Sequence, residues 1–164
     1  MEQENVTHPF LPLYGSESRI LILGSLPSLK SREENFYYGN PMNRFWKVIA
    51  AIFNKNPPSS IEEKKTLILE NHLALWDAIY RCDITGSSDQ SIRNAEPTNL
   101  FPVIENSKIK HIFCNGKTAW NYYNTHQRKS LEIEAKCLPS TSPANASWTF
   151  EKLLEEWKIF LDCL

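Results

Sequence analysis

The feature that most constrains the fold is an unbroken apolar run, from Ile20 to Leu23, that stops at Gly24. A strand with one face in solvent alternates apolar and polar residues, whereas a strand that is buried on both faces does not. Both faces are buried mainly in parallel sheets, where helices cover the two sides. The run therefore predicts a central strand of a parallel sheet.

Strand-like and helix-like segments alternate along the rest of the chain. Asn43 stands at the N-cap position of one apolar segment with helical spacing. The patterns predict helices at 43–54, 60–71, 117–126 and 148–164, strands at 20–23, 73–76, 109–114 and 133–138, and a polar, irregular segment at 82–102. This alternation indicates an α/β fold with a mainly parallel sheet of about four strands.

Length and composition fit one compact domain over residues 1–164. The chain has 164 residues, 41% of them hydrophobic, which suits a single core. No apolar run reaches the roughly 18 residues of a membrane helix. The N-terminus carries Glu2 and Glu4 without an apolar segment. We therefore expect no membrane association, no secretory signal and a cytoplasmic location.

The net charge and the spacing of the cysteines bear on whether the protein binds nucleic acid or a metal. The net charge is −1, whereas nucleic-acid-binding proteins are usually basic, although a local patch matters more than the sum. The four cysteines, Cys82, Cys114, Cys137 and Cys163, form no C-x-x-C pair. Because zinc and iron–sulfur sites normally use close cysteine pairs, we expect buried apolar thiols and no metal site.

A ligand site is expected where the predicted strands end. In open parallel sheets, ligands bind outside the carboxyl ends of the strands. The segments that follow these ends are Gly24–Ser28, the residues from Asp77 onward, Asn115-Gly116 and Pro139–Asn145, and the loop 31–43 lies beside them. Small hydroxyl residues in the first and last of these loops suit DNA phosphates. An ordinary Ser-Pro turn explains the same residues more simply.

The turn Gly116-Lys117-Thr118 resembles the end of a phosphate-binding P-loop. That motif needs a further glycine five residues before its second glycine, and this chain has His111 there. We therefore favour a strand-to-helix turn with an exposed lysine. A small-nucleotide hydrolase or phosphate-binding α/β enzyme that uses this turn stays open as an alternative function.

Short motifs spread from His8 to Asn145 form the most specific pattern in the chain. They are His8-Pro9-Phe10, Pro12-Leu13, Gly24–Ser28, Phe36-Tyr37-Tyr38-Gly39, Asn43-Arg44-Phe45-Trp46, Leu75-Trp76-Asp77 and Leu138–Asn145. In this order they resemble the hypoxanthine (deoxyinosine) branch of the uracil-DNA glycosylase superfamily. The resemblance implies a three-layer α/β/α sandwich, a base flipped into a pocket at the strand ends, and hydrolysis of the N-glycosidic bond without a cofactor.

The resemblance also implies the partner, which is DNA containing a deaminated base: hypoxanthine, or else uracil or xanthine. We expect a monomer, and no lyase activity because no lysine stands out as a Schiff-base nucleophile. A non-enzymatic nucleic-acid-binding domain of the same fold stays open as a second alternative.

The chain departs from the better-known branches of this superfamily at three positions. The loop Gly24–Ser28 lacks the Asp or Asn that orients the attacking water in those branches. Leu138 stands where they have a His that stabilises the departing base, and Asp77 stands where they have the Asn that reads uracil. The water must therefore be held by another residue.

The resemblance and these departures assign roles to individual residues. Asn43 is the candidate for holding the water, with Ser25 as a weaker partner, although capping of the helix would use the same carbonyl oxygen of Asn43. Tyr38 or Phe36 would stack on the flipped base, and Asp77 would accept from its N–H, or donate if protonated. The residues expected to grip phosphates or to wedge into the vacated stack are Ser28, Pro139, Ser140, Thr141, Ser142, Pro143, Ala144 and Asn145.

Overall fold

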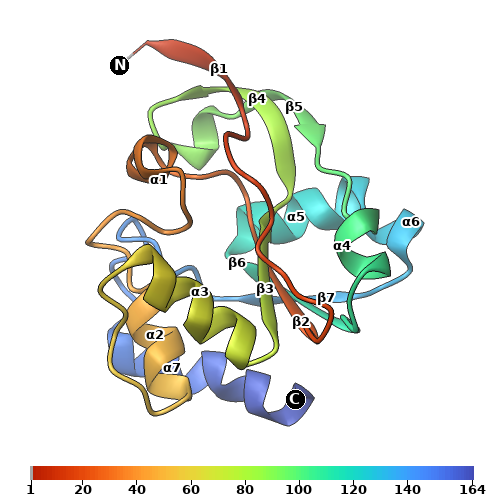
Figure 1. The fold of residues 1–164 in the computed structure, drawn as a ribbon. Helices are drawn as coiled ribbons and strands as arrows, with labels where there is room; N and C mark the ends of the chain where they lie inside the picture. The colour runs from red at the N-terminus through yellow and green to blue at the C-terminus, as the bar shows by residue number, and fades with distance from the viewer. Residues whose placement is uncertain (1) are drawn as a thin grey trace.

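The central element is a four-stranded parallel sheet with the strand order β3-β2-β6-β7 (Figure 1). The structure is a computed structural model and describes residues 2–164. The four strands are β2 (Ile20–Gly24), β3 (Leu73–Asp77), β6 (His111–Asn115) and β7 (Ala135–Leu138). The predicted α/β class and its four-stranded parallel sheet are confirmed.

Strand β2 lies in the middle of this sheet, and all of its residues are buried. It pairs in parallel with β3 on one side and with β6 on the other. The register sets Gly24 beside Asp77, and it sets Asn115 of β6 beside Leu138 of β7. The segments that follow the strands therefore meet at one edge of the sheet.

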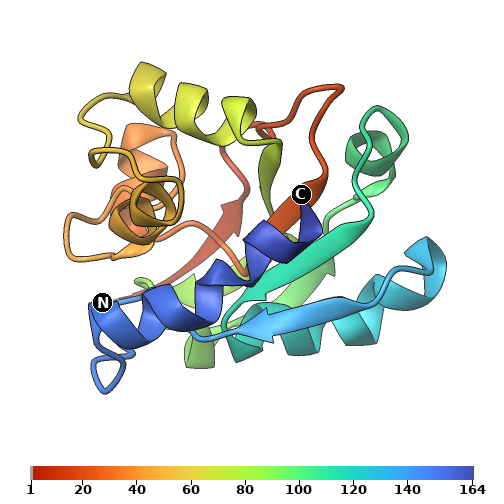
Figure 2. The same ribbon diagram turned by 90° about the horizontal axis from the view of Figure 1, so that it is seen from below.

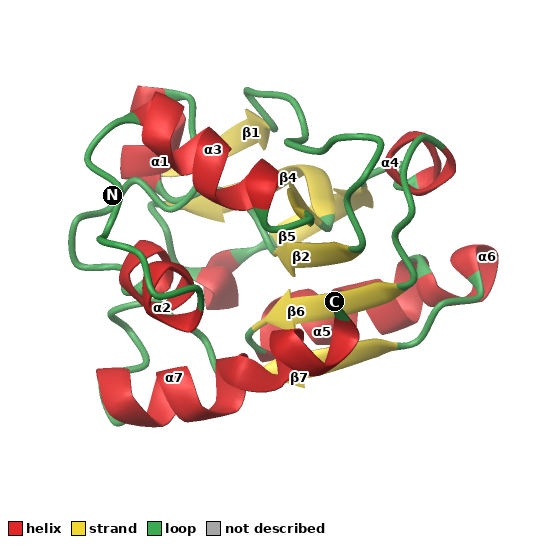
Figure 3. Ribbon diagram, turned by 60° about the horizontal axis from the view of Figure 1, so that its bottom comes forward, coloured by secondary structure: helices red, strands yellow, loops and turns green. Residues whose placement is uncertain are grey.

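Helices cover both faces of the sheet and give the three layers that the resemblance implies. They are α1 (Leu29–Glu34), α2 (Phe45–Ile52), α3 (Ile61–Glu70), α4 (Phe101–Glu105), α5 (Lys117–His126), α6 (Arg128–Leu131) and α7 (Phe150–Trp157), with the 3-10 helices η1 (Asp89–Ser91) and η2 (Lys158–Cys163). Figures 2 and 3 show α7 and α5 on opposite sides of β6 and β7, while α3 packs along β3.

The helix boundaries agree with the sequence pattern to different degrees. The predicted helix at 117–126 has the bounds of α5. The single helix predicted at 148–164 is instead two elements, because α7 ends at Trp157 and the chain continues as the tighter η2. This turn brings Phe160 edge-on to Phe113, with 4.9 Å between the ring centroids. The end of the chain is thus set by packing on the sheet.

A second, antiparallel sheet lies outside the predicted architecture. It has the order β1-β4-β5 and consists of β1 (Gln3–Thr7), β4 (Ile79–Thr85) and β5 (Arg93–Pro97). The prediction that 82–102 is irregular was wrong for the end of β4 and for all of β5. Strands β1 and β5 are mostly exposed, so no hydrophobic periodicity marks them, and they form by pairing with β4. Strand β4 is partly buried, through Ile79, Cys82 and Ile84.

The cysteines are all free, and two of them depart from the expectation of burial. Cys82 and Cys114 are buried, whereas Cys163 is half-buried and Cys137 is exposed on the edge strand β7. Within residues 2–164, no cluster of His, Cys, Asp or Glu side chains is arranged to hold a metal ion. None of the helices in this described part is long and apolar enough to cross a membrane.

Candidate active site

A cleft of about 530 Å³ opens where the strands of the parallel sheet end. Its size suits a small ligand or a single base with its sugar. Gly24–Ser28 and Ser140–Ala144 form parts of its lining. The rest comes from the 37–43 loop and the segment 87–90, and from Ser31, Asp77, Asn115 and Thr118. The loops that the sequence predicts at the strand ends therefore do line one site.

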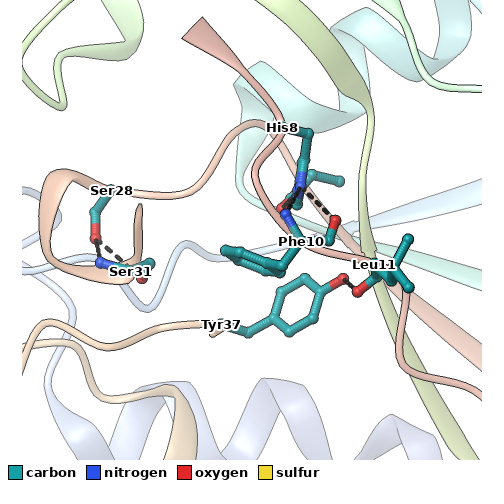
Figure 4. A network of polar contacts seen from close by, with 7 residues as sticks. His8, Phe10, Leu11, Ser28, Ser31 and Tyr37 are labelled. Atoms are coloured by element: carbon teal, nitrogen blue, oxygen red, sulfur yellow. Dashed lines mark hydrogen bonds and ion pairs between the residues drawn. The ribbon is translucent and has the colours of Figure 1, made fainter. Parts of the chain in front are cut away.

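The floor of the cleft holds a buried pair formed by His8 and Asp77. His8 Nε2 lies 2.7 Å from Asp77 Oδ2, and the two side chains are 0% and 5% exposed. The other ring nitrogen, Nδ1, lies 3.0 Å from the carbonyl oxygen of Phe10, as Figure 4 shows. The imidazole also packs against the ring of Trp76, with 4.4 Å between centroids. The N-terminal segment thus reaches across 69 residues to fix one carboxylate oxygen.

Gly24 makes room for the other oxygen of that carboxylate. A Cβ atom at this position would stand 2.4 Å from Asp77 Oδ1 and 3.2 Å from the hydroxyl oxygen of Tyr38. The first distance is shorter than any real contact, so the glycine is required by space. Oδ1 and the Tyr38 hydroxyl therefore lie around the same small volume at the base of the cleft.

Tyr38 is held in an unusual backbone conformation. Its φ angle is 52°, in the left-handed region, and its ring stacks on Phe45 with 4.0 Å between centroids. Its hydroxyl oxygen is buried and has no hydrogen-bond partner within residues 2–164. Burial, and then the charge of Asp77, raise the pKa of Tyr38 well above its usual value. The Asn115 carboxamide approaches the hydroxyl oxygen as a donor without reaching hydrogen-bond geometry, and it lowers the pKa by less. The hydroxyl therefore keeps its proton and is available as a donor.

The neighbouring Tyr37 has a structural role in the same loop. Its hydroxyl donates to the carbonyl oxygen of Leu11 at 2.9 Å (Figure 4). Its ring meets Phe10 edge-on, with 4.7 Å between centroids. Tyr37 thus ties the aromatic loop to the N-terminal segment that carries His8.

Asn43 lines the cleft and lies one residue before Arg44, which is the N-cap of α2, so the predicted N-cap position was wrong by one residue. Asn43 still bonds to the first turn of the helix. Its Oδ1 accepts from the N–H of Phe45 at 2.9 Å. A carboxamide oxygen has two lone pairs, so this bond occupies one and leaves another for a water molecule. The two roles expected for Asn43 therefore share one oxygen and are compatible.

Ser25 is paired with a carboxylate that comes from a distant part of the chain. Its hydroxyl donates to Oδ1 of Asp89, in η1, at 3.1 Å, and both residues line the cleft. Although Asp89 as a residue is exposed, desolvation by the surrounding loops raises the pKa of its carboxyl, against hydrogen bonds from Ser25 and Thr118. The first loop lacks a carboxylate of its own, and Asp89 brings one beside it.

The loop Pro139–Asn145 is held from outside by three side chains, those of Arg44, Asn115 and Trp157. The Arg44 guanidinium donates to the carbonyl oxygens of Ser142 at 2.9 Å, of Asn145 at 3.1 Å, and of Trp148. Asn115 donates to the hydroxyl of Thr141 and accepts from its N–H, both at 3.0 Å. The loop is therefore preorganised by contacts to its backbone.

Hydrogen bonds within this loop leave some hydroxyl protons free. The hydroxyl oxygens of Ser140 and Ser142 accept from the N–H groups of Ser142 and Ala144, at 3.1 and 3.2 Å. Their own protons can still be donated into the cleft, which both residues line. Thr141 differs because it is 0% exposed and engaged by Asn115. The structure thus leaves the Ser140 and Ser142 hydroxyls open to the cleft and encloses Thr141.

The comparisons with known proteins agree with one another. The family model described as "Uracil DNA glycosylase superfamily" matches residues 11–162. The chain belongs to the uracil DNA glycosylase superfamily. A Methanosarcina acetivorans protein named "Hypoxanthine DNA glycosylase" is 35% identical over 152 residues, which cover 91% of this chain and 94% of that protein. A Methanosarcina barkeri protein of the same name is 30% identical over 139 residues, covering 83% and 86%.

A solved structure agrees with the family at the level of the fold. The solution NMR structure of a Methanosarcina acetivorans protein, proposed to be a uracil DNA glycosylase, matches with a TM-score of 0.80 and 31% identity. The match covers 94% of this chain and 96% of that chain. The superfamily fold therefore extends over nearly the whole chain.

Most of the residues predicted for a superfamily site meet in the cleft, but three do not line it. Phe36 is buried and stacks on Trp46, with 6.1 Å between centroids. The carbonyl oxygen of Pro139 accepts from the indole of Trp157 at 3.0 Å, and the carboxamide of Asn145 donates to the Ser140 carbonyl at 3.0 Å. The predicted residues that line it are Ser25, Ser28, Tyr38, Asn43, Asp77, Ser140, Thr141, Ser142, Pro143 and Ala144.

Ser28 has a local role besides lining the cleft. Its hydroxyl oxygen accepts from the N–H of Ser31 at 3.2 Å and so caps α1. Ala144 is exposed at the tip of its loop, so of the two predicted wedge residues it is the one free to enter a base stack.

Sequence reasoning missed four residues that contribute to this candidate site: His8, Arg44, Asn115 and Asp89. His8 and Arg44 belong to motifs that carry the resemblance, yet their roles depend on contacts 69 to 104 residues away. The alternative P-loop role of Gly116 gains no support, because its N–H donates to the carbonyl of Leu138 at 2.9 Å and is not free for a phosphate.

Proposed function

We propose that the chain is a monofunctional DNA glycosylase that hydrolyses the N-glycosidic bond of a deaminated base, with hypoxanthine as the main substrate. The observation that carries the proposal is a cleft with a base-sized polar floor at Asp77 and a hydroxyl-bearing loop at Ser140–Ala144. The names of the two relatives, which are 35% and 30% identical to this chain, support the choice of hypoxanthine. A monomer in the cytoplasm is the expected working form.

The reaction begins when the damaged nucleotide leaves the stack and enters the cleft. The base then faces Asp77 and Tyr38, while Ser140 and Ser142 donate to its flanking phosphates. The bond between C1′ and the base breaks with its electron pair moving to the base, so the sugar gains positive charge. A water oxygen then bonds to C1′ and its proton passes to solvent or to a nearby acceptor.

Asn43 and the Ser25–Asp89 pair position the attacking water. Asn43 Oδ1 uses one lone pair on Phe45 N–H and can accept from the water with the other. Because Ser25 donates its proton to Asp89, its oxygen is turned to accept. The negative Asp89 carboxylate also stabilises the developing positive charge on the sugar. Groups fixed toward such charge usually make the largest contribution to catalysis.

Release of free base from defined duplexes tests the proposal. Duplexes that carry hypoxanthine, uracil, xanthine or only normal bases are incubated with the protein in excess EDTA. We expect free hypoxanthine and an abasic site, with no protein–DNA adduct after borohydride. Loss of activity in EDTA would instead favour a metal-dependent hydrolase, and tight binding without release would favour a non-enzymatic DNA-binding domain.

A further inference from the structure

We propose that His8 is a positioning residue that makes Asp77 Oδ1 a permanent hydrogen-bond acceptor toward the flipped base. This inference rests on the proposed function, because it names how the cleft recognises a deaminated base. His8 itself touches no substrate and acts through Asp77. Its exposed fraction of 0% in the side chain excludes direct contact with DNA.

The hydrogen bonds of His8 determine where its protons are. Nδ1 lies 3.0 Å from the Phe10 carbonyl oxygen, which can only accept, and 3.5 Å from the Phe10 nitrogen, whose N–H can only donate. We assign a hydrogen to Nδ1 because the contact to the carbonyl is the shorter of the two. Nε2 lies 2.7 Å from Asp77 Oδ2, and a contact this short needs one proton between the two atoms. The pair is therefore either imidazolium with carboxylate or neutral imidazole with a carboxylic acid.

Both placements of that proton have the same consequence for the cleft. The shared proton lies between Nε2 and Oδ2, so Oδ1 carries none in either case. A protonated Asp77 would still present a carbonyl-like Oδ1 to the base. Of the two roles that the sequence left open for Asp77, the hydrogen bond to His8 selects the acceptor.

The His8–Asp77 pair also avoids electrostatic repulsion between Asp77 and the departing base. A lone carboxylate at the floor of the cleft would repel a base that departs with negative charge. The His8–Asp77 pair is neutral as a whole in both proton placements, and the two side chains are buried at 0% and 5% exposure. Burial of a charge is strongly unfavourable unless it is paired, and here it is paired. The cleft thus gains an acceptor without a net negative charge beside the leaving base.

Tyr38 supplies the matching donor. Its hydroxyl has no partner within residues 2–164, and it lies with Asp77 Oδ1 around the space left by Gly24. An adjacent acceptor and donor match the N1–H and C6=O of hypoxanthine, or the N3–H and C4=O of uracil. Adenine and cytosine offer a bare ring nitrogen and an amino group at those places. A site built this way rejects bases that leave its polar groups unpaired.

Replacement of Asp77 by Asn gives the sharpest test. In Asp77→Asn, the Phe10 carbonyl keeps the hydrogen on Nδ1 of His8, so Nε2 accepts from the new carboxamide N–H. The carboxamide oxygen then takes the place of Oδ1. We expect release of hypoxanthine under single-turnover conditions to stay within about tenfold of the parent, which is ~1.4 kcal/mol in the barrier. A loss greater than about tenfold would overturn the proposal, because it would mean that the charge of Asp77 is needed.

His8→Phe is the complementary variant, since it keeps a ring against Phe10 and Trp76 but leaves Asp77 unpaired. We expect a loss on the order of 10²-fold in hypoxanthine release. The double variant His8→Phe with Asp77→Asn removes the unpaired charge and should recover part of that loss. If His8 served only packing, the double variant would be no faster than His8→Phe.

Nitrogen NMR of the His8 ring decides the arrangement without any activity. We expect a protonated Nδ1 in the parent and in Asp77→Asn, and a bare Nε2 in the variant. A parent protein with an unprotonated Nδ1 contradicts the inference. If the parent releases no hypoxanthine, the proposed function fails, while the spectra still decide the His8–Asp77 pair. The spectra of the parent and Asp77→Asn also suffice if His8→Phe does not fold.

Discussion

The floor of the cleft at Asp77 and the loop Pro139–Asn145 are held by different kinds of contact. Asp77 is fixed through its own side chain, by His8 on one oxygen and by the space at Gly24 for the other. The loop is fixed through its backbone, with carbonyl oxygens that accept from Arg44 and from the indole of Trp157.

Under the proposed function, this difference follows from what each part would recognise. A base is read by the position of a few donors and acceptors, so a side chain must be held in one protonation state. A phosphate is the same at every nucleotide, so a loop that offers hydroxyl protons needs only a fixed shape. Changes at the Asp77 floor should therefore alter which base is released, whereas changes at the loop should alter affinity for all DNA.

Asn43 lies between these two parts, and its loss should have the largest effect. Asn43→Ala should lower the single-turnover rate on the order of 10²–10³-fold, as expected for a group that acts on the transition state. The lost bond to the Phe45 N–H should destabilise the fold by ~1 kcal/mol, or about 2–4 °C in Tm. DNA affinity should be kept.

Asn40→Ala is the control for Asn43. Asn40 lines the same cleft, and its Oδ1 accepts from the N–H of Met42 at 2.9 Å. We expect it to keep its rate. If Asn43→Ala melts early yet releases base at the parent rate, Asn43 is only a cap and another group holds the water.

Gly24→Ala tests the floor itself. The new methyl would stand 2.4 Å from Asp77 Oδ1, so the carboxylate must move. Displacement of a recognition group by about 1 Å can lower a rate by about 10²-fold, and discrimination between hypoxanthine and adenine should fall with it. Gly15→Ala is the matched control, since its Cβ meets only Leu69 at an ordinary 3.8 Å. An active Gly24→Ala with unchanged base preference would argue against Asp77 as the reader.

Arg44→Met tests whether the contacts of Arg44 to the backbone of the loop Pro139–Asn145 matter for DNA binding. Loss of the guanidinium contacts to three carbonyl oxygens should loosen the loop, lower the Tm and weaken DNA binding by about tenfold. The order of preference among bases should not change. Lys47→Met is the control, because it removes the same charge from an exposed position of α2. Equal weakening in both variants would show that charge matters and the loop contacts do not.

The double variant Ser140→Ala with Ser142→Ala removes the two hydroxyls that the loop offers to the cleft. It should weaken DNA binding less than Arg44→Met does. Each neutral hydroxyl contributes about 0.5–1.5 kcal/mol, so binding should weaken by a similar factor for every DNA sequence. The salt dependence of binding should be shallow compared with a protein that makes about 6–10 basic phosphate contacts. A changed choice of base with unchanged affinity would exclude a phosphate-binding role.

The sequence predicts the parallel sheet well and the second sheet poorly, for a physical reason. Strand β2 is buried on both faces, and its sequence is therefore an unbroken apolar run that is easy to recognise. Strand β5 is mostly exposed, so its residues carry no comparable pattern. The pattern of apolar residues in a segment indicates which side chains are buried. Strand β5 instead forms because its backbone pairs with β4, which such a pattern does not indicate.

The candidate site shows the same limit. Small residues and hydroxyls at strand ends mark the cleft, so Ser25, Asn43 and Asp77 could be found from the sequence. The His8–Asp77 bond joins residues 69 positions apart, and no local pattern encodes it. Asp89 was missed for the same reason, because its partner Ser25 lies 64 positions away.

Asp89→Asn should have the smallest effect on stability. Most substitutions lower the stability of the fold, whereas this one should leave it unchanged or raise it slightly. The pKa of Asp89 is raised in the folded protein, first by burial of its carboxyl. Folding therefore favours the protonated form, and stability falls as pH rises from the unfolded pKa through the folded one. Asn carries no charge, so Asp89→Asn should melt at the same or a slightly higher temperature than the parent at neutral pH. The two proteins should converge at acidic pH, while base release by the variant should slow if the carboxylate stabilises the sugar.

Asp83→Asn is the control of opposite sign, because Asp83 lies on β4 outside the cleft lining. Hydrogen bonds from Asn94 and then Asn5 lower the pKa of Asp83. Its contribution to stability is present above the unfolded pKa and is lost as pH falls through the folded one. Asp83→Asn should therefore lower the Tm slightly at neutral pH and leave base release unchanged. Melting curves of the two variants across pH give the comparison. An Asp89→Asn that also melts early would mean that the folded protein favours the charged Asp89, and that this carboxylate stabilises the fold.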